Sequence, residues 1–155
     1  MPNTLIAAAV ISPTQGRSLN ILGHQVRLVL GQQHTGGKSY VMEVVTPGGH
    51  GIPPHVHTVE DEVIQVLEGD YEVLLGDQVH LASAGATLHF PVGVVHAFKN
   101  TGKSPGRTLW FVSPGSNFEM FFDKLDALPQ NGPPDMGLIA GIFAEHGMTI
   151  LTPGA

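Results

Sequence analysis

The most informative part of this chain is the stretch Gly49-His50-Gly51-Ile52-Pro53-Pro54-His55-Val56-His57-Thr58-Val59-Glu60-Asp61-Glu62. His55 and His57 are two residues apart, so on a β-strand both side chains point to one face and Val56 points to the other. Two imidazoles on one face can chelate a metal ion at about 2.0–2.2 Å per ligand. Pro53-Pro54 disfavours a helix and holds the chain extended before the pair. The stretch therefore predicts a metal-binding strand.

A carboxylate and a third imidazole can reach the same ion. Glu62 follows His57 by five residues across a short polar connection. In the segment Gly85 to Asn100, a Pro- and Gly-containing turn precedes His96, whose strand parity lets it face inward between apolar residues. Three neutral imidazoles and one carboxylate suit one divalent transition metal ion: Fe, Mn, Ni, Co, Cu or Zn. On an ion that accepts five or six ligands, four protein ligands also leave a coordination position open, as catalytic metal sites do.

The composition favours a β-rich folded domain. Apolar residues make up 42% of the 155 residues and charged residues 13%, which excludes a disordered, highly charged chain. The 20 Gly and 12 Pro fall between short apolar runs, as expected for many turns and short strands. The net charge of −6 and the lack of a basic cluster argue against nucleic acid or an anionic membrane as a partner. The absence of Cys excludes disulfides and thiolate metal sites.

Short strand candidates follow each other closely and predict a sandwich or closed barrel over about residues 19–113. Residues 31–38 are expected to form a turn between the candidates Gln25 to Leu30 and Ser39 to Thr46. The candidates are Gln25 to Leu30, Ser39 to Thr46, Val63 to Leu67, Tyr71 to Leu75, Gln78 to Ala82, Ala86 to Phe90, Val95 to Asn100 and Arg107 to Ser113.

After Pro114 the pattern becomes helical, over about residues 116–147. Ser116 or Asn117 can cap a first helix, whose apolar residues recur at spacings of three and four. Asp135 can cap a second helix that ends at Gly147. No linker or internal repeat divides the chain, so we expect a single domain over residues 1–155, with the helices covering one mouth or flank of the barrel.

Both metal-ligand segments resemble the two signature motifs of the cupin superfamily. The first motif, G(x)5HxH(x)3–4E(x)6G, is matched by Gly49, His55, His57, Glu62 and Gly69. The second, G(x)5PxG(x)2H(x)3N, is matched by Gly85, Pro91, Gly93, His96 and Asn100. The resemblance implies an all-β fold, the double-stranded β-helix or jelly roll, with a metal ion inside the barrel. It also implies that the ligands are His55, His57, Glu62 and His96.

Among cupins, the chain looks most like small single-domain bacterial members related to quercetin 2,3-dioxygenases. The cues are the stretches 57–62, 96–100 and 109–115, followed by a Phe-rich helix. Gln65 departs from the aromatic residue that many relatives carry there, so the packing near it can differ. Small cupins commonly pair, so a homodimer is expected.

This resemblance implies a metal-dependent dioxygenase that cleaves an oxygen-rich aromatic or enol small molecule. Glu62 would be both ligand and catalytic base for the substrate hydroxyl. Two alternatives stay open: a metal-dependent cyclase or isomerase that uses no dioxygen, and a non-catalytic module that binds a small molecule. Fold alone does not decide among them.

Apolar side chains inside the barrel are candidates for a substrate pocket, although simple core packing is the alternative for each of them. The pocket candidates are Met42, Ile64, Phe90, Phe98 and Phe111. His50 and His89 are expected at the rim or the surface rather than as further ligands. The remaining histidines are expected to be solvated; they are His24, His34, His80 and His146.

The N-terminal apolar stretch from Leu5 to Ile11 is too short to span a bilayer and has no Lys or Arg before it. A cytoplasmic location is therefore the default expectation.

Overall fold

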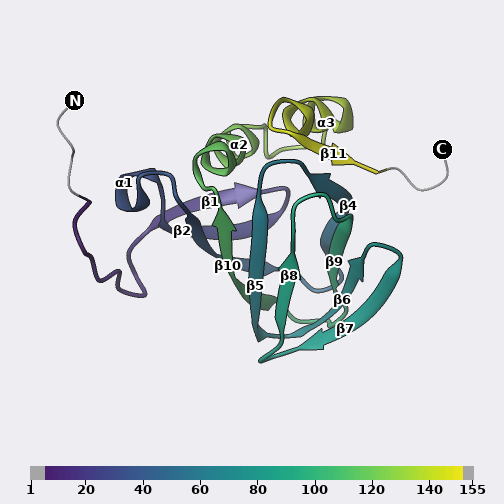
Figure 1. Cartoon of the computed structure of the whole chain (residues 1–155). Coiled ribbons are helices and arrows are strands. Elements are labelled where there is room, and N and C mark those ends of the chain that lie inside the picture. The colour runs from purple at the N-terminus through teal and green to yellow at the C-terminus, as the bar shows by residue number, and fades with distance from the viewer. Residues whose placement is uncertain (1–5, 152–155) are drawn as a thin grey trace.

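Two antiparallel β-sheets form a barrel, and two helices cover one end of it (Figure 1). The computed structural model describes residues 6–151, so Leu5 and both ends of the predicted domain lie outside the described residues. The six-stranded sheet has the order β1 (Arg17–Ile21), β2 (His24–Leu30), β3 (Tyr40–Thr46), β10 (Gly106–Ser113), β5 (Asp61–Glu68) and β8 (Thr87–Phe90). The five-stranded sheet has the order β11 (Met148–Ile150), β4 (Gly51–His57), β9 (His96–Asn100), β6 (Asp70–Leu75) and β7 (Gln78–Ser83).

The predicted all-β jelly roll with C-terminal helices is confirmed, and the structure adds three elements to the prediction. Strand β1 pairs with β2 across a tight turn at Leu22-Gly23, where both residues have positive φ. The expected turn at residues 31–38 contains a short helix, α1 (Gln32–Thr35). Strand β11 follows the helices in the chain and forms the edge of the five-stranded sheet, where it pairs with β4.

Helices α2 (Ser116–Asp126) and α3 (Met136–Glu145) differ in how they begin. The prediction of a Ser116 or Asn117 cap is wrong: Gly115 is the N-cap and no side chain caps α2. The reason is that both side chains bond elsewhere, Ser116 to the Gln32 side chain. The Asp135 cap of α3 is confirmed, since its carboxylate accepts the Leu138 N–H at 3.0 Å.

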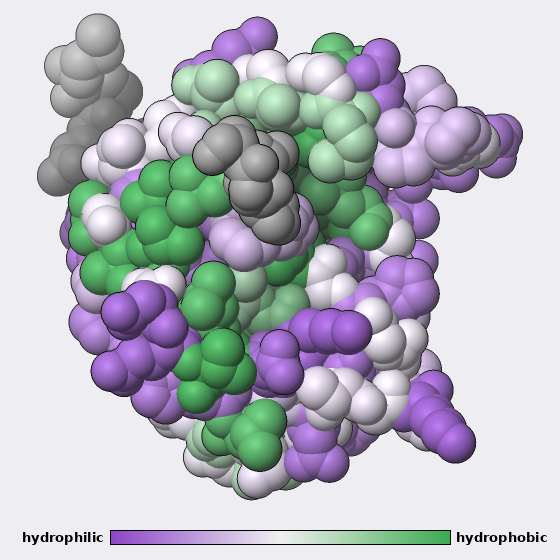
Figure 2. Space-filling model, turned by 90° about the vertical axis from the view of Figure 1, so that its right-hand side faces the viewer, coloured by the Kyte–Doolittle hydropathy of each residue, from purple (hydrophilic) through white to green (hydrophobic). Residues whose placement is uncertain are grey.

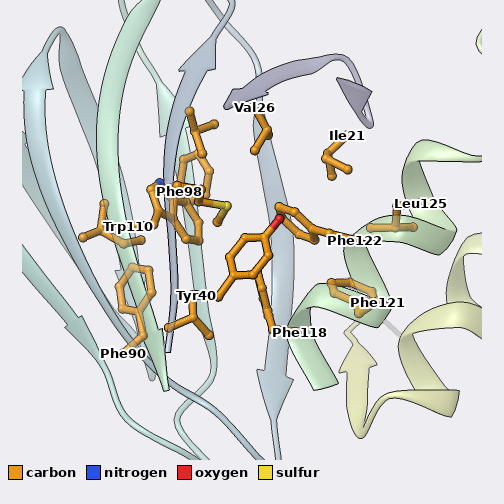
Figure 3. Close-up of a cluster of buried hydrophobic side chains, with 14 of the residues drawn as sticks. Ile21, Val26, Tyr40, Phe90, Phe98, Trp110, Phe118, Phe121, Phe122 and Leu125 are labelled. Atoms are coloured by element: carbon orange, nitrogen blue, oxygen red, sulfur yellow. The ribbon is translucent and has the colours of Figure 1, made fainter. Parts of the chain in front are cut away.

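Helix α2 seals the barrel with aromatic side chains. Its buried face points toward the strands, as Figure 3 shows for Phe118, Phe121, Phe122 and Leu125. Tyr40 on β3 packs edge-on against the rings of Phe118 and Phe122, at centroid distances of 5.4 and 5.9 Å. The core is therefore continuous from the barrel interior into the helical cap, which we define as α2, α3 and β11.

Two prolines in β4 shift its register against β9. Ile52 pairs with Phe98, whereas His55 pairs with His96, so the ladder gains one residue at Pro53-Pro54. Proline has no N–H for the ladder, which is why it is tolerated at such a bulge. An extra residue reverses the inward and outward alternation. The bulge thereby turns His55 to the same interior side as Ile52.

Several large apolar side chains also remain on the surface, and Figure 2 shows hydrophobic and hydrophilic residues intermixed on the side that holds the C-terminal strand. Within residues 6–151, no helix combines the length and the apolar character needed to cross a membrane.

Replacing Phe121 with Ala should lower the free energy of unfolding by about 3–5 kcal/mol, since a buried ring is removed from the cap. Phe121 lies edge-on against Phe143 of α3, with centroids 4.9 Å apart. The matched control is Met120→Ala, at an exposed neighbouring position of α2, which should change stability by no more than about 0.5 kcal/mol. Urea denaturation measures both, and equal small losses would contradict the role of the cap in the core.

Candidate metal centre

The four predicted ligands meet inside the barrel, where the two sheets face each other. His55 and His57 come from β4, and His96 lies opposite His55 on β9. Glu62 comes from β5 in the other sheet. One ring nitrogen from each of the three histidines lies within 4.8 Å of the others. All four side chains are buried, so this polar cluster is held away from water.

The Nδ1 atom of each histidine points away from the cluster toward an acceptor. In His55 it lies 2.9 Å from the Pro53 carbonyl oxygen, and in His96 it lies 3.0 Å from that of Val94. In His57 it lies 3.2 Å from Oε2 of Glu60. These acceptors have no proton to give, so each Nδ1 carries the proton. The Nε2 lone pairs are then free to face a metal ion.

Several polar atoms at the centre of the cluster have no hydrogen-bond partner among the described residues. These are Nε2 of His57, Nε2 of His96 and Oε2 of Glu62. The two oxygens of Glu62 lie 3.8 Å from His57 Nε2 and 3.3 Å from His96 Nε2. Unpaired buried polar atoms destabilise a fold, and a coordinated cation would satisfy them together. The donor set thus fits a divalent transition metal ion, and the three-histidine cluster could hold one.

Burial and mutual charge set the ionisation of the cluster. Burial lowers the pKa of His55 to about 4, with a further lowering by His96. Burial also lowers the pKa of His57, but the hydrogen bond to Glu60 and the charge of Glu62 outweigh it and leave that pKa raised. Burial raises the pKa of Glu62, yet the neighbouring imidazoles hold it below its ordinary value. At neutral pH the cluster therefore offers a carboxylate and at least one neutral imidazole.

Aromatic rings fix the imidazoles in place. Phe90 stacks on His96 with centroids 4.2 Å apart and planes 21° from parallel. Two rings of the cap cover the other histidines: Phe118 stacks near His57 at 6.2 Å, and Phe143 meets His55 edge-on at 5.9 Å. The ligand cluster is therefore walled by the barrel on one side and by the cap on the other.

A cavity of about 50 Å³ adjoins His55, His57 and Glu62. It is walled almost wholly by apolar side chains, and Figure 3 shows several of them between the strands and α2. The remaining wall consists of Ile21, Leu22, His24, Val26, Met42, Val44, Ile52, Phe98, Trp110, Phe118, Phe121, Phe122, Leu125 and Phe143.

The predicted pocket residues divide into three groups. Met42 and Phe98 line the cavity. Ile64 and Phe90 are buried but belong to the packed core rather than to the cavity wall. The prediction that Phe111 lines the pocket is wrong, because its side chain is 45% exposed on the outer face of the six-stranded sheet. Alternation along β10 explains this, because the neighbouring Trp110 takes the inward position.

The other histidines follow the prediction except for two. His50 and His89 are exposed, as expected, and so is His80, while His34 is partly exposed. His24 and His146 were expected to be solvated and are buried instead. His24 lies in the cavity wall, where its Nδ1 is 3.1 Å from the Thr46 hydroxyl, and burial lowers its pKa.

Glu60 and Asn117 are site residues that the sequence prediction missed. Glu60 is fully buried behind His57, and Asn117 of α2 donates to its Oε1 at 2.6 Å. The position of Glu60, three residues after His57 in the same stretch, was the available signal. Asn117 is 57 residues further along the chain from Glu60, and no pattern in the sequence links them.

In the metal-free protein, the His55 ring should stay neutral on acidification until about pH 4, because burial opposes its charged form. In the unfolded chain His55 takes up a proton near its ordinary pKa of about 6.5. Its contribution to stability is therefore complete above about pH 6.5 and falls as the pH drops toward 4. Imidazole NMR signals followed against pH, with the urea-unfolded protein as control, measure this. Titration of folded His55 near pH 6.5 would contradict it.

Comparisons with known proteins agree on the family. A profile of the cupin domain matches residues 41–112, which contain all four predicted ligands. Protein SchB of Streptomyces halstedii is 34% identical over 93 residues, which cover 59% of this chain and 67% of SchB. The polyketide synthase CurC of Streptomyces cyaneus is 32% identical over 66 residues, which cover 43% of each chain. The alignment thus spans less than half of CurC.

The fold is also similar to that of solved structures. The structure of KdgF from Halomonas sp. superposes with a TM-score of 0.64 at 18% sequence identity, covering 73% of this chain and 99% of KdgF. At that identity the likeness concerns the fold. Together with the two ligand-bearing motifs and the jelly-roll topology, these matches identify the chain as a member of the cupin superfamily.

Proposed function

We propose that this cupin is a metal-dependent dioxygenase that cleaves an oxygen-rich aromatic or enol small molecule. The observation that carries the proposal is the buried cluster of His55, His57, His96 and Glu62 at the wall of an apolar cavity. Bound there, a divalent ion would acidify a substrate hydroxyl and stabilise the resulting anion. The apolar lining of the cavity supports the same proposal, since few polar groups other than the cluster would screen that charge.

Glu62 is the group that can take the proton of the substrate hydroxyl. Its carboxylate is 1% exposed, and the imidazoles of His96 and His57 hold its pKa below the ordinary value. A carboxylate is a weak base in such surroundings, but the acidified hydroxyl needs only a nearby acceptor. Glu62 lies in the cavity wall, within reach of a substrate oxygen that approaches the cluster.

The size of the cavity limits what it holds as the structure stands. About 50 Å³ has room for a few water-sized molecules, and an apolar lining favours a small apolar one such as dioxygen. A ring system needs more space. A surface groove of about 600 Å³, formed beside the connection between α2 and α3, is separated from the cavity by a shared wall. That wall consists of Leu22, Ile52, Leu125 and Phe143, and a larger substrate would enter by displacing it.

A second candidate is a metal-dependent cyclase or isomerase that needs no dioxygen. It is favoured by the likeness to CurC, which is named a polyketide synthase. The same centre could serve both reactions, because each begins with a substrate oxygen made anionic beside the cluster. The homodimer expected from the sequence stays a prediction alongside either reaction.

Oxygen consumption distinguishes the two reactions. The metal-loaded protein should take up dioxygen when supplied with a flavonol or a 1,3-dicarbonyl compound, and no product should form under nitrogen. Product formation under nitrogen would favour the cyclase or isomerase. Tight ligand binding without turnover, whichever metal is loaded, would favour a binding module and contradict both enzymes.

Replacing Glu62 with Gln should abolish turnover while part of the metal affinity remains. Gln keeps a coordinating oxygen of similar reach but loses the charge and the ability to accept a proton. Elemental analysis and oxygen uptake, measured on the same preparation, test this. Glu68→Gln, on the exposed end of β5, is the matched control and should leave both quantities unchanged. Full activity of the Glu62→Gln protein would rule out the proposed base.

A further inference from the structure

A fully buried carboxylate lies behind the candidate metal centre without taking part in the ligand cluster. Glu60 is on the connection between β4 and β5, and its side chain is 0% exposed. Its Oε2 lies 3.2 Å from Nδ1 of His57, on the side of the ring away from Glu62 and His96. A carboxylate only accepts hydrogen bonds, so this contact requires the proton on Nδ1. Nε2 of His57 is thereby left free for the centre.

The partner of His57 differs in kind from those of the other two imidazoles. His55 and His96 each have a backbone carbonyl as acceptor, from Pro53 and Val94. Only His57, among these three, is held by a side chain, and that side chain is charged. A carboxylate raises the basicity of an imidazole more than a neutral carbonyl does. Glu60 should therefore make His57 a stronger donor to a metal ion.

The second oxygen of Glu60 connects the centre to the helical cap. Oε1 accepts from Nδ2 of Asn117 at 2.6 Å. The same amide group donates to the His146 carbonyl oxygen at 2.8 Å, and its Oδ1 lies 2.9 Å from His146 Nδ1. Asn117 thus holds Glu60 on one side and the end of α3 on the other. These bonds leave both oxygens of Glu60 paired and fix its orientation.

The balance of charge around Glu60 and Glu62 also favours a bound metal ion. Glu60 and Glu62 place two buried carboxylates beside three buried imidazoles. Buried charges are costly unless they are compensated. One divalent cation would balance the two carboxylates while all three imidazoles stay neutral.

We propose that Glu60 is a positioning residue of the metal centre: it fixes the tautomer and orientation of His57, and Asn117 of the cap holds it in place. This inference rests on the proposed function, because it requires that the cluster bind a metal ion. Loss of such a supporting partner typically weakens metal binding about 10- to 100-fold.

Three variants separate this role from simple packing. Glu60→Met keeps a similar volume but accepts no hydrogen bond from Nδ1–H, so Co²⁺ affinity should fall about 100-fold. Glu60→Gln keeps an accepting oxygen and loses the charge, so affinity should fall only about tenfold. Asp61→Asn is the matched control, since Asp61 is an exposed neighbour whose loss of charge should leave affinity unchanged. Competition with a chelator measures all three and the wild-type protein.

A second readout reports the tautomer directly. In the Zn²⁺-loaded protein, the hydrogen-bonded Nδ1–H of His57 should give a downfield proton NMR signal in the wild type and in Glu60→Gln. That signal should be lost in Glu60→Met, with the signals of His55 and His96 as internal references. A packing role alone would not remove it.

Equal Co²⁺ affinity of Glu60→Met and Asp61→Asn would overturn the inference. Should Glu60→Met fail to fold, as judged by melting of the metal-free protein, equal affinity of Glu60→Gln and Asp61→Asn would overturn it instead. A wild-type protein that binds neither Co²⁺ nor Zn²⁺ would defeat the metal-centre proposal itself. Wild-type binding that the Glu60 substitutions leave unchanged would defeat only the role of Glu60.

Discussion

The burial of Glu62 between His57 and His96 is the interaction on which the rest of the structure depends. A carboxylate that is 1% exposed must be compensated, and the rings that compensate it come from the opposite sheet. The cluster can form only if β4, β5 and β9 meet at one depth inside the barrel. The bulge at Pro53-Pro54 supplies the one-residue shift that brings His55 opposite His96. The arrangement of the polar centre is therefore a consequence of strand register.

The helical cap protects this centre and is also bonded to it. Phe118 and Phe143 cover two imidazoles, and strand β11 pairs with β4 directly beside them. Gly147 joins α3 to β11 with φ of 77°, and its carbonyl accepts both the N–H and the hydroxyl of Thr58. A side chain there would be strained by the backbone conformation alone. The C-terminal segment thus completes the site as well as the core, so access to the cavity and the structure of the centre depend on the same elements.

Local patterns in the sequence predicted short strands in a sandwich or barrel, and the resemblance to the two cupin motifs narrowed this to a jelly roll with four candidate ligands. Strand alternation relates His55 to His57, and the Gly and Pro positions mark the turns around them. The prediction failed where position depends on partners distant in the chain. Strand β11 is three residues long and pairs with β4, while His146 is buried against α2, where Asn117 and Phe121 contact its ring. Alternation along β10 permits only one of Trp110 and Phe111 to face inward, and the buried residue is Trp110.

The central claim is that these four side chains converge on one metal ion, and metal stoichiometry tests it most directly. Elemental analysis of the purified protein, with a His96→Ala variant prepared in parallel, measures the ion content per chain. The account predicts about one divalent transition metal ion per chain in the wild type and its loss in the variant. No bound metal after reconstitution, or a variant that retains the ion at wild-type affinity, would contradict it.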